Sequence, residues 1–228
     1  MDALQILAAG ARMPVGPTAE SVAAAVRTGV SRVQLTRSQA WGNVDDGADW
    51  FFAMDPLLDR DDTSAASRIA TLGRAALGEL VAKLARALPR TNIEVPVLVG
   101  LPEERPGWSP ADLGAVSAAL AAVDEAAGFR LRIELRPRGH AAAIEALHEA
   151  QQRLPHDRPG MIILGGVDSY HDPETLAWLR ENQQWLGEES RTGFAPGEGA
   201  AFVMVMRTSE AKRLGLKIVI ATAESPVM

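Results

Sequence analysis

The chain has 228 residues, of which 47% are hydrophobic, and a formal net charge of −6 from 23 basic and 29 acidic side chains. This composition predicts an ordinary globular protein with a sizeable core, and the lack of repeats or linkers predicts one domain over residues 1–228. A mildly acidic chain without a basic run repels a phosphate backbone, which argues against nucleic acid as a partner. With no apolar run of membrane-spanning length and no basic leader, a cytoplasmic protein without a membrane partner is expected.

Cysteine is absent from the chain. Its absence excludes disulfides, thiolate zinc sites and a cysteine nucleophile. We expect neither a cofactor nor a metal site.

The first half of the chain alternates between strand and helix patterns. A short apolar run at residues 4–9 predicts a buried strand, and Thr18 is placed to cap a helix that stops at Gly29. Residues 36–61 are polar with aromatic anchors and receive no assignment. A long helix is expected at 63–88, with apolar side chains at steps of three and four: Ile69, Leu72, Ala76, Leu80, Leu84 and Leu88.

Residues 93–100 predict a strand, in which Pro96 indicates an edge or a bulge because proline lacks a ladder donor. The pair Ser109-Pro110 opens a helix expected to reach about Ala127. Residues 129–136 give the clearest strand, because four apolar side chains alternate strictly with four charged ones. The charged face indicates either an interface or a solvated surface.

A helix follows at 140–154, and the continuous apolar run at 161–169 predicts a buried parallel strand. The pair Asp172-Pro173 starts a helix to about Trp185. Residues 197–207 and 216–223 predict two more strands. Strands alternating with helices predict an α/β fold with a mostly parallel mixed sheet layered with helices, and the short connection between the last two strands favours an antiparallel pair.

Three segments, in order, resemble the N-terminal half of the β-ketoacyl (3-oxoacyl-ACP) synthases, thiolase-like condensing enzymes of fatty-acid and polyketide biosynthesis. Residues 6–33 are similar to the family's opening strand, glycine turn and first helix. Residues 138–169 are similar to its nucleophile helix followed by a Gly-Gly strand, here with a turn at Gly165 and Gly166. The resemblance implies a half of the thiolase-like fold.

The third segment, residues 191–206, resembles the loop-and-strand signature GFxxGEGA and is the most specific of the three. Its glycines are expected to adopt backbone shapes that other residues avoid, with the glutamate fixed between two of them. The signature positions are Gly193, Phe194, Gly197, Glu198 and Gly199.

The chain departs from the family at the nucleophile. The family carries a cysteine at a helix N-terminus, where the helix dipole favours the thiolate. The resemblance places His140 at that position, with alanines after it in place of serines. The family's two catalytic histidines lie in its second half, for which this chain has no counterpart. His140 is therefore interpreted as a vestige, a polar plug or a helix-terminal residue without catalytic role.

Other candidate sites favour structural interpretations. His140, His148 and His156 are spaced by eight residues, about 80° and over 11 Å apart on a helix, so they cannot share an ion. Asp168, Ser169 and His171 suggest a hydrolytic triad, but adjacency in sequence is not triad geometry. Asp172 is expected to cap a helix, and residues 103–105 to form a solvated charged turn.

The resemblance therefore implies a degenerate or truncated 3-oxoacyl-ACP synthase-like protein that pairs with a catalytic synthase subunit or binds an acyl carrier protein. The first alternative is the N-terminal half of an intact condensing enzyme whose second half lies elsewhere. The second is an unrelated module that binds a small molecule at the Gly165-Gly166 turn.

The resemblance also implies a homodimer through residues 129–136, because the family pairs this strand with its twofold mate. A twofold axis near Ile133 would place Arg132 opposite Glu134 of the partner subunit. The same register sets Arg130 against the partner's Arg136, which opposes association.

Overall fold

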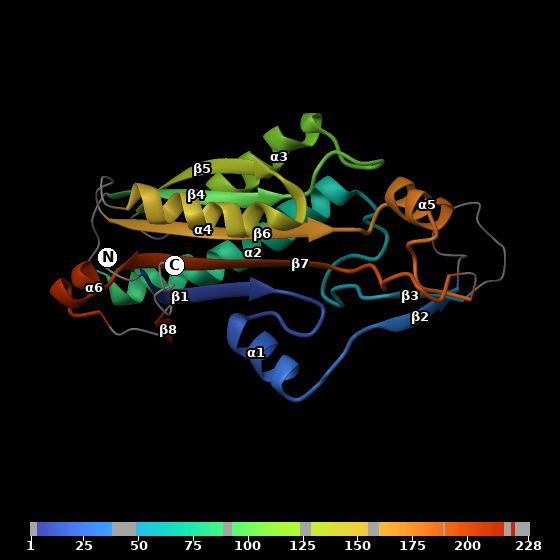
Figure 1. Cartoon of the computed structure of the whole chain (residues 1–228), viewed down its shortest axis with the longest axis horizontal. Helices are drawn as coiled ribbons and strands as arrows, with labels where there is room; N and C mark the ends of the chain where they lie inside the picture. The colour runs from blue at the N-terminus through green and yellow to red at the C-terminus, as the bar shows by residue number, and fades with distance from the viewer. Residues whose placement is uncertain are drawn as a thin grey trace, which may run out of the picture.

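A six-stranded mixed sheet organises the molecule, in the order β5-β4-β6-β7-β1-β8 (Figure 1). The computed structural model describes residues 4–37, 49–88, 93–123, 129–154, 160–188, 190–216 and 220–221. A separate antiparallel pair joins β2 and β3. The strands are β1 (Leu4–Arg12), β2 (Gln34–Arg37), β3 (Asp49–Phe52), β4 (Ile93–Leu101), β5 (Phe129–Pro137), β6 (Met161–Ser169), β7 (Glu198–Arg207) and β8 (Ile220–Ala221).

Helices cover the sheet unequally. In Figure 1, α4 lies in front of β4 and β6, whereas α2 runs behind the sheet. No helix lies in front of β7 and β1, so this part of the front face is uncovered by the elements that the structure describes. The helices are α1 (Ala19–Arg27), α2 (Ala65–Ala87), α3 (Leu113–Ala121), α4 (Ala142–Arg153), α5 (Pro173–Glu181) and α6 (Thr208–Arg213), with 3-10 turns η2 (Pro110–Asp112) and η4 (Gly139–Ala141).

The predicted α/β class is confirmed, and the strand predicted at 161–167 lies in the interior of the sheet as β6, between β4 and β7. Strand directions differ from the prediction. Among the described strands, β4 is parallel to β5 and β6, whereas β6·β7, β7·β1 and β1·β8 are antiparallel. The parallel part is thus smaller than the βαβ pattern indicated.

The predicted antiparallel pairing of the last two strands is wrong. The first strand of the chain, β1, lies between β7 and β8 and is antiparallel to both. A short connection suggested direct neighbours, but the N-terminal strand occupies the place beside β7. Residues 217–219 and 222–223 of the last predicted strand lie outside the described residues.

Pro96 lies within β4, an interior strand, and not at an edge of the sheet. The reason is local register. At Pro96 the strand pairs with Arg132 of β5, but its pairing with β6 starts only at Val97. Pro96 therefore has a ladder neighbour on one side only, which is where a residue without an N–H is tolerated.

Two helices are shorter than predicted. α5 ends at Glu181, because Gln183 takes a left-handed backbone conformation with a φ of 55° and Trp185 instead packs on Trp50, with ring centroids 4.9 Å apart. α3 ends at Ala121, and residues 124–128 lie outside the described part. The N-cap at Thr18 is confirmed, with Ser21 as its reciprocal partner.

The main core lies between α2 and the sheet. The apolar face predicted for the long helix is buried throughout, and β1 approaches it very closely at Gly10. A Cβ at this glycine would lie 2.1 Å from the carbonyl oxygen of Ala76, so no larger residue fits without moving α2. The helix contributes these fully buried side chains: Ile69, Leu72, Ala76, Leu77 and Leu80.

β5 forms one edge of the sheet, with β4 as its neighbour. The predicted alternation is confirmed from Leu131 onward, since Leu131, Ile133 and Leu135 pack on the main core. The charged face of β5 is only partly exposed to solvent, and its side chains form ion pairs within the chain. Glu134 is already bound by Arg132, Arg136 and Arg153 of the same chain.

In the described residues, no helix is both long and apolar enough to cross a membrane.

Candidate functional site

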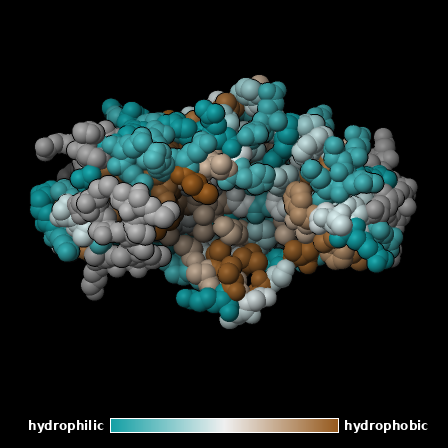
Figure 2. Space-filling model, in the orientation of Figure 1, coloured by the Kyte–Doolittle hydropathy of each residue, from teal (hydrophilic) through white to brown (hydrophobic). Residues whose placement is uncertain are grey.

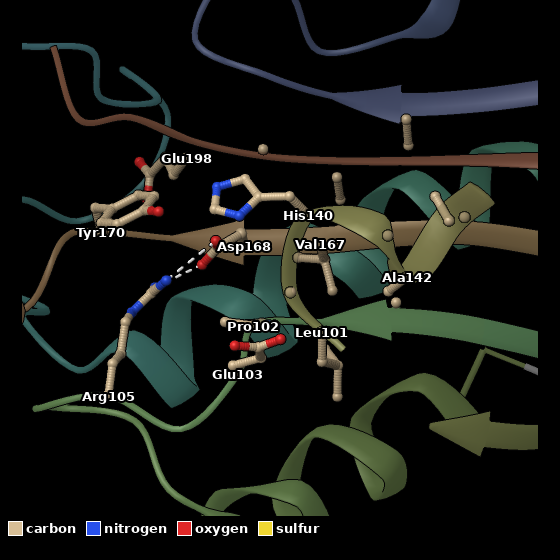
Figure 3. A pocket seen from close by; sticks show the side chains of 18 of the residues that line it. Leu101, Pro102, Glu103, Arg105, His140, Ala142, Val167, Asp168, Tyr170 and Glu198 are labelled. Carbon is tan, nitrogen blue, oxygen red and sulfur yellow. Dashed lines mark hydrogen bonds and ion pairs between the residues drawn. The ribbon is translucent and has the colours of Figure 1, made fainter. Parts of the chain in front are cut away.

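A cavity of about 820 Å³ opens where β4 and β6 end, β7 begins and α4 starts. Its body is apolar and its rim carries charged side chains (Figure 3). Five of the positions that carried the resemblance line the cavity, and they come from three separate segments: His140, Gly165, Gly166, Glu198 and Gly199. The lining includes Leu101, Glu103, Arg105, His140, Ala142, Leu164, Gly165, Gly166, Val167, Asp168, Tyr170, Glu198, Gly199 and Val203.

His140 lies in the turn η4 that leads into α4, and its exposed side chain lines the cavity. The N-cap residue of α4, Ala141, provides no side-chain hydrogen bond to the helix start. Ala142 and Ala143 line the cavity beside it. The turn is therefore formed by small residues and an imidazole, without a hydroxyl or a thiol that would cap the helix or attack a ligand.

Glu198 is the centre of a buried polar cluster on one wall of the cavity. Its side chain is 0% exposed and that of Arg68 is 1% exposed. Arg68 donates from Nε at 2.7 Å and from Nη2 at 2.6 Å. Glu198 also accepts from the backbone N–H of Asp55 at 2.8 Å and from Ser169 Oγ at 2.9 Å. Four hydrogen bonds compensate for the burial of the charge.

The hydrogen bonds of the cluster extend to the loop before α2 and to the end of β1. Arg68 donates from Nη1 to the carbonyl oxygens of Asp59 and Asp62 in the loop before α2. The Asp55 carboxylate accepts hydrogen bonds from Nε and Nη2 of Arg12, at the end of β1. The cluster therefore joins β1, the 55–62 loop, α2, β6 and β7 at the end of the sheet where the cavity lies.

Arg105 forms a second polar group at the rim. Its side chain is 9% exposed, and Nη2 donates to Asp168 at 2.6 Å and to the carbonyl oxygen of Ser169 at 2.8 Å. The guanidinium carbon also lies 4.2 Å from the ring centroid of Tyr170. Burial, followed by the charge of Asp168, raises the pKa of Tyr170. The expected solvated turn at 103–105 is therefore wrong for Arg105, because a carboxylate and an aromatic ring hold it in place.

The polar residues at the end of β6, namely Asp168, Ser169 and the following His171, do not form a triad. Ser169 donates to Glu198, while His171 is buried with its ring 5.5 Å from Phe52. Burial, followed by the charge of Arg68, lowers the pKa of His171 to about 4. Asp172 accepts from the N–H groups of Glu174 and Thr175, which confirms it as the N-cap of α5.

Gly165 and Gly166 lie inside β6, not at a turn as predicted. The strand continues to Ser169 because both glycines keep their ladder partners on β4 and β7. A Cβ on Gly165 would lie 2.1 Å from the carbonyl oxygen of Ala201, whereas one on Gly166 would meet nothing closer than 3.4 Å. Gly165 is therefore needed because β6 and β7 approach each other closely there, and not because the chain turns.

The signature glycines have a similar explanation. None of Gly193, Gly197 and Gly199 has a positive φ, so the expected unusual backbone shapes are absent at these positions. A Cβ on Gly193 would lie 2.6 Å from the carbonyl oxygen of Gln184, and one on Gly199 would lie 3.0 Å from the Met13 side chain. Phe194 lies beside Tyr170 in an edge-to-face contact with centroids 5.4 Å apart.

The other histidines do not join the cavity. His148 contacts Gln152 on the exposed side of α4, and His156 lies outside the described residues. Within the part of the chain that the structure describes, no three His, Cys, Asp or Glu side chains are grouped to hold a metal ion.

Sequence reasoning missed the partners of Glu198 and the role of Arg105. A signal was present for Arg68, because it follows Ala65 by three residues and precedes Leu72 by four. Those spacings place a charged side chain on the buried face of a helix, where it needs a partner. No sequence pattern linked Arg105 to Asp168, which lies 63 residues away.

Comparison with known proteins supports the resemblance at the level of the fold. A 95-residue stretch is 30% identical to the pikromycin polyketide synthase component PikAII of Streptomyces venezuelae, covering 38% of this chain and 2% of that protein. No protein-family model matches the chain.

Solved ketosynthases superpose on nearly the whole chain. The ketosynthase from module 6 of the bacillaene synthase of Bacillus subtilis 168 matches with a TM-score of 0.66 at 17% identity, over 95% of this chain and 42% of that one. A type II polyketide ketosynthase in complex with its acyl carrier protein gives 0.67 at 14%, over 95% and 60%. The ishigamide ketosynthase/chain length factor gives 0.63 at 18%, over 96% and 65%.

The chain spans less than two thirds of the length of these ketosynthases. It contains no cysteine. The protein therefore has the thiolase-like fold of the ketosynthases, over part of their length.

Proposed function

We propose that this chain is a non-catalytic ketosynthase-like subunit that binds an acyl carrier protein or a catalytic synthase partner. One observation carries the proposal. The cavity is lined by the positions that resemble the family. Among them is His140, in the turn before α4, at the position where the family has its cysteine. The cavity is thus present without a cysteine to accept an acyl chain, which supports a binding role.

The chemistry of condensation explains why binding is favoured over catalysis. The family's route needs a thiolate nucleophile at the helix start. Here an imidazole stands there, and the sequence has no cysteine. The residues that surround His140 in the cavity include Glu103 and Asp168, but Asp168 is bound to Arg105. In the part of the chain that the structure describes, the imidazole has no hydrogen-bond partner that would orient it as a nucleophile or base.

Carrier-protein binding is supported by one solved relative of the fold, a ketosynthase in complex with its acyl carrier protein. Native mass spectrometry of the chain, with and without a carrier protein in its acylated form, tests this proposal. We expect a one-to-one complex without a covalent acyl adduct. If neither a carrier protein nor a catalytic ketosynthase subunit forms a complex at micromolar concentration, the proposal fails.

We also propose that the chain is one domain that dimerises through residues 129–136. The support is the edge position of β5, which offers backbone groups for a further strand. Since Glu134 is already bound within the chain, the cross-subunit pair with Arg132 contributes little, and the backbone ladder supplies most of the association energy. Ile133→Pro removes a ladder donor and is expected to give monomer or aggregate by sedimentation. A monomeric wild type at micromolar concentration contradicts the dimer.

The uncovered front of the sheet favours a second candidate, one half of a condensing enzyme whose other half is supplied separately. Ile144 of α4 is 73% exposed, and Ile6 and Val203 at the uncovered strands are only partly buried. Figure 2 shows hydrophobic side chains gathered on this face. A stable complex of the chain with an isolated ketosynthase C-terminal half, seen in native mass spectra, together with no complex with a complete ketosynthase subunit, would favour this candidate over the binding subunit.

A further inference from the structure

Exposed hydrophobic side chains are concentrated on one segment, the end of α1 and the chain that follows it. Of the nine large hydrophobic residues that are exposed in the described part of the chain, four lie within residues 26–35. Figure 2 shows hydrophobic side chains gathered at the place that α1 occupies in Figure 1. Single exposed apolar residues need no explanation, but such a group indicates a contact surface. The four are Val26 (67% exposed), Val30 (48%), Val33 (44%) and Leu35 (55%).

This segment is held in a fixed position on the body of the protein. The cap at Thr18 starts α1, and the Glu79 carboxylate of α2 accepts from the backbone N–H of Ala19 at 3.1 Å. At the other end of the helix, Val30 donates its N–H to the carbonyl oxygen of Ala25 at 2.9 Å. A surface that is ordered before binding loses less entropy when a partner docks.

The same segment is positively charged, although the whole chain has a net charge of −6. No Asp or Glu occurs between residues 21 and 35, whereas Arg27 and Arg32 do, and both are exposed. Among the described residues, neither arginine has an ion-pair partner. Glu20, at the start of α1, is already paired with Lys83. An apolar centre beside two unpaired cations is complementary to carboxylates around an apolar face.

We propose that this surface docks an acidic amphipathic helix of the carrier protein. The choice of a carrier protein rests on the proposed function, and the size of the surface favours it over a synthase subunit. Each side of a stable interface provides about 20–30 residues, so a surface of six fits a small partner that binds transiently. We call it the α1 patch, and it consists of Val26, Arg27, Val30, Arg32, Val33 and Leu35.

Charge reversal tests the electrostatic half of the proposal. Titration calorimetry with an acylated acyl carrier protein measures the affinity. Arg27→Glu combined with Arg32→Glu is expected to lower it at least about tenfold, and to remove its decrease between about 50 mM and about 500 mM salt. Arg86→Glu combined with Arg213→Glu is the matched control, because it changes the net charge equally at two exposed arginines outside the patch. The control should bind like the wild type.

A second pair of variants tests the apolar half. Val26→Ser is expected to lower the affinity about three- to tenfold, because less apolar area is buried in the complex. Leu57→Ser is its control, since Leu57 is 66% exposed and lies outside the patch, and it should leave the affinity unchanged. Thermal melting establishes that the variants are folded. Should the charge-reversed pair not fold, Arg27→Gln combined with Arg32→Gln is expected to weaken binding in the same direction.

A folded patch variant that binds the carrier protein like the wild type overturns the inference and leaves the proposed function standing. Equal losses in the patch variants and their controls overturn it as well. A wild type that binds a catalytic ketosynthase subunit but no carrier protein contradicts the inference alone, whereas binding of neither contradicts both. Patch-dependent docking by a chain that also condenses acyl groups supports the inference and contradicts the non-catalytic role.

Discussion

Glu198 and His140 line the same cavity, yet their surroundings differ completely. Glu198 is buried and accepts four hydrogen bonds from three residues. His140 is exposed, in a turn that gives the start of α4 no side-chain cap. A buried charge without its partners is costly, while an exposed imidazole has few neighbours to lose. The difference indicates that the GEGA segment maintains the fold, and that the helix start can change its chemistry without loss of structure.

The largest effect is expected when the Glu198 carboxylate loses its counter-charge. Arg68→Met should lower the free energy of unfolding by about 3–5 kcal/mol, because one partner of a buried ion pair is removed. His140→Ala should change it by less than about 0.5 kcal/mol, as expected for an exposed side chain. Urea unfolding of both variants measures the contrast. Equal effects would contradict the distinction between the two regions.

The next effect concerns two adjacent glycines of β6. Gly165→Ala should cost about 1–3 kcal/mol, since overpacking forces backbone shifts, and the new Cβ would lie 2.1 Å from the Ala201 carbonyl oxygen. Gly166→Ala has ordinary contacts at 3.4 Å and should be close to neutral. Urea midpoints of the two variants give the comparison, and a larger loss for Gly166→Ala would mean that the strand packing is described wrongly.

A pH effect is expected from His171, which lies behind the Glu198 cluster. Burial, followed by the charge of Arg68, lowers its pKa to about 4 from 6.5. Between these values the unfolded chain binds more protons than the folded one, so stability increases with pH across this window and is lost as the pH falls. His171→Phe should reduce the dependence of the urea midpoint on pH between 4 and 6.5. An unchanged slope would exclude His171 as its source.

The smallest effect is expected on the charged face of β5. Burial opposes ionisation of Glu134, but hydrogen bonds from Arg153 and Arg136 lower its pKa overall. These side chains are partly exposed, so the pairs are screened. Glu134→Gln should cost less than about 1 kcal/mol, and the cost should decrease at high salt. A loss as large as that of Arg68→Met would show that this network is as essential as the buried one.

Local patterns predicted the elements well, because helix and strand periodicities depend on neighbours in sequence. The alternation of β5, the apolar face of α2 and the caps at Thr18 and Asp172 are local features of this kind. Strand order was not local: β1 lies between β7 and β8 because a segment about 200 residues away pairs there. Nothing in a short window reveals which distant strand takes that position.

The cavity was predicted only in part, for the same reason. The resemblance singled out His140 and Glu198 separately, and the structure places both in the lining of one cavity. The contacts that hold the cavity were missed, because Arg68–Glu198 and Arg105–Asp168 join residues 130 and 63 positions apart. The glycines at 165 and 193 were attributed to backbone conformation, whereas close contacts with backbone atoms of other segments require them.

We propose that this chain, which has the ketosynthase fold, does not carry out condensation. The most direct measurement is an assay of the purified chain with acyl- and malonyl-loaded carrier proteins, in which ketoacyl product and acylated protein are both followed by mass spectrometry. We predict neither product nor a stable acyl adduct for the wild type. His140→Cys should likewise give no ketoacyl product, because this chain has no counterpart of the family's two catalytic histidines. Turnover by the wild type that is lost in His140→Ala would contradict the account.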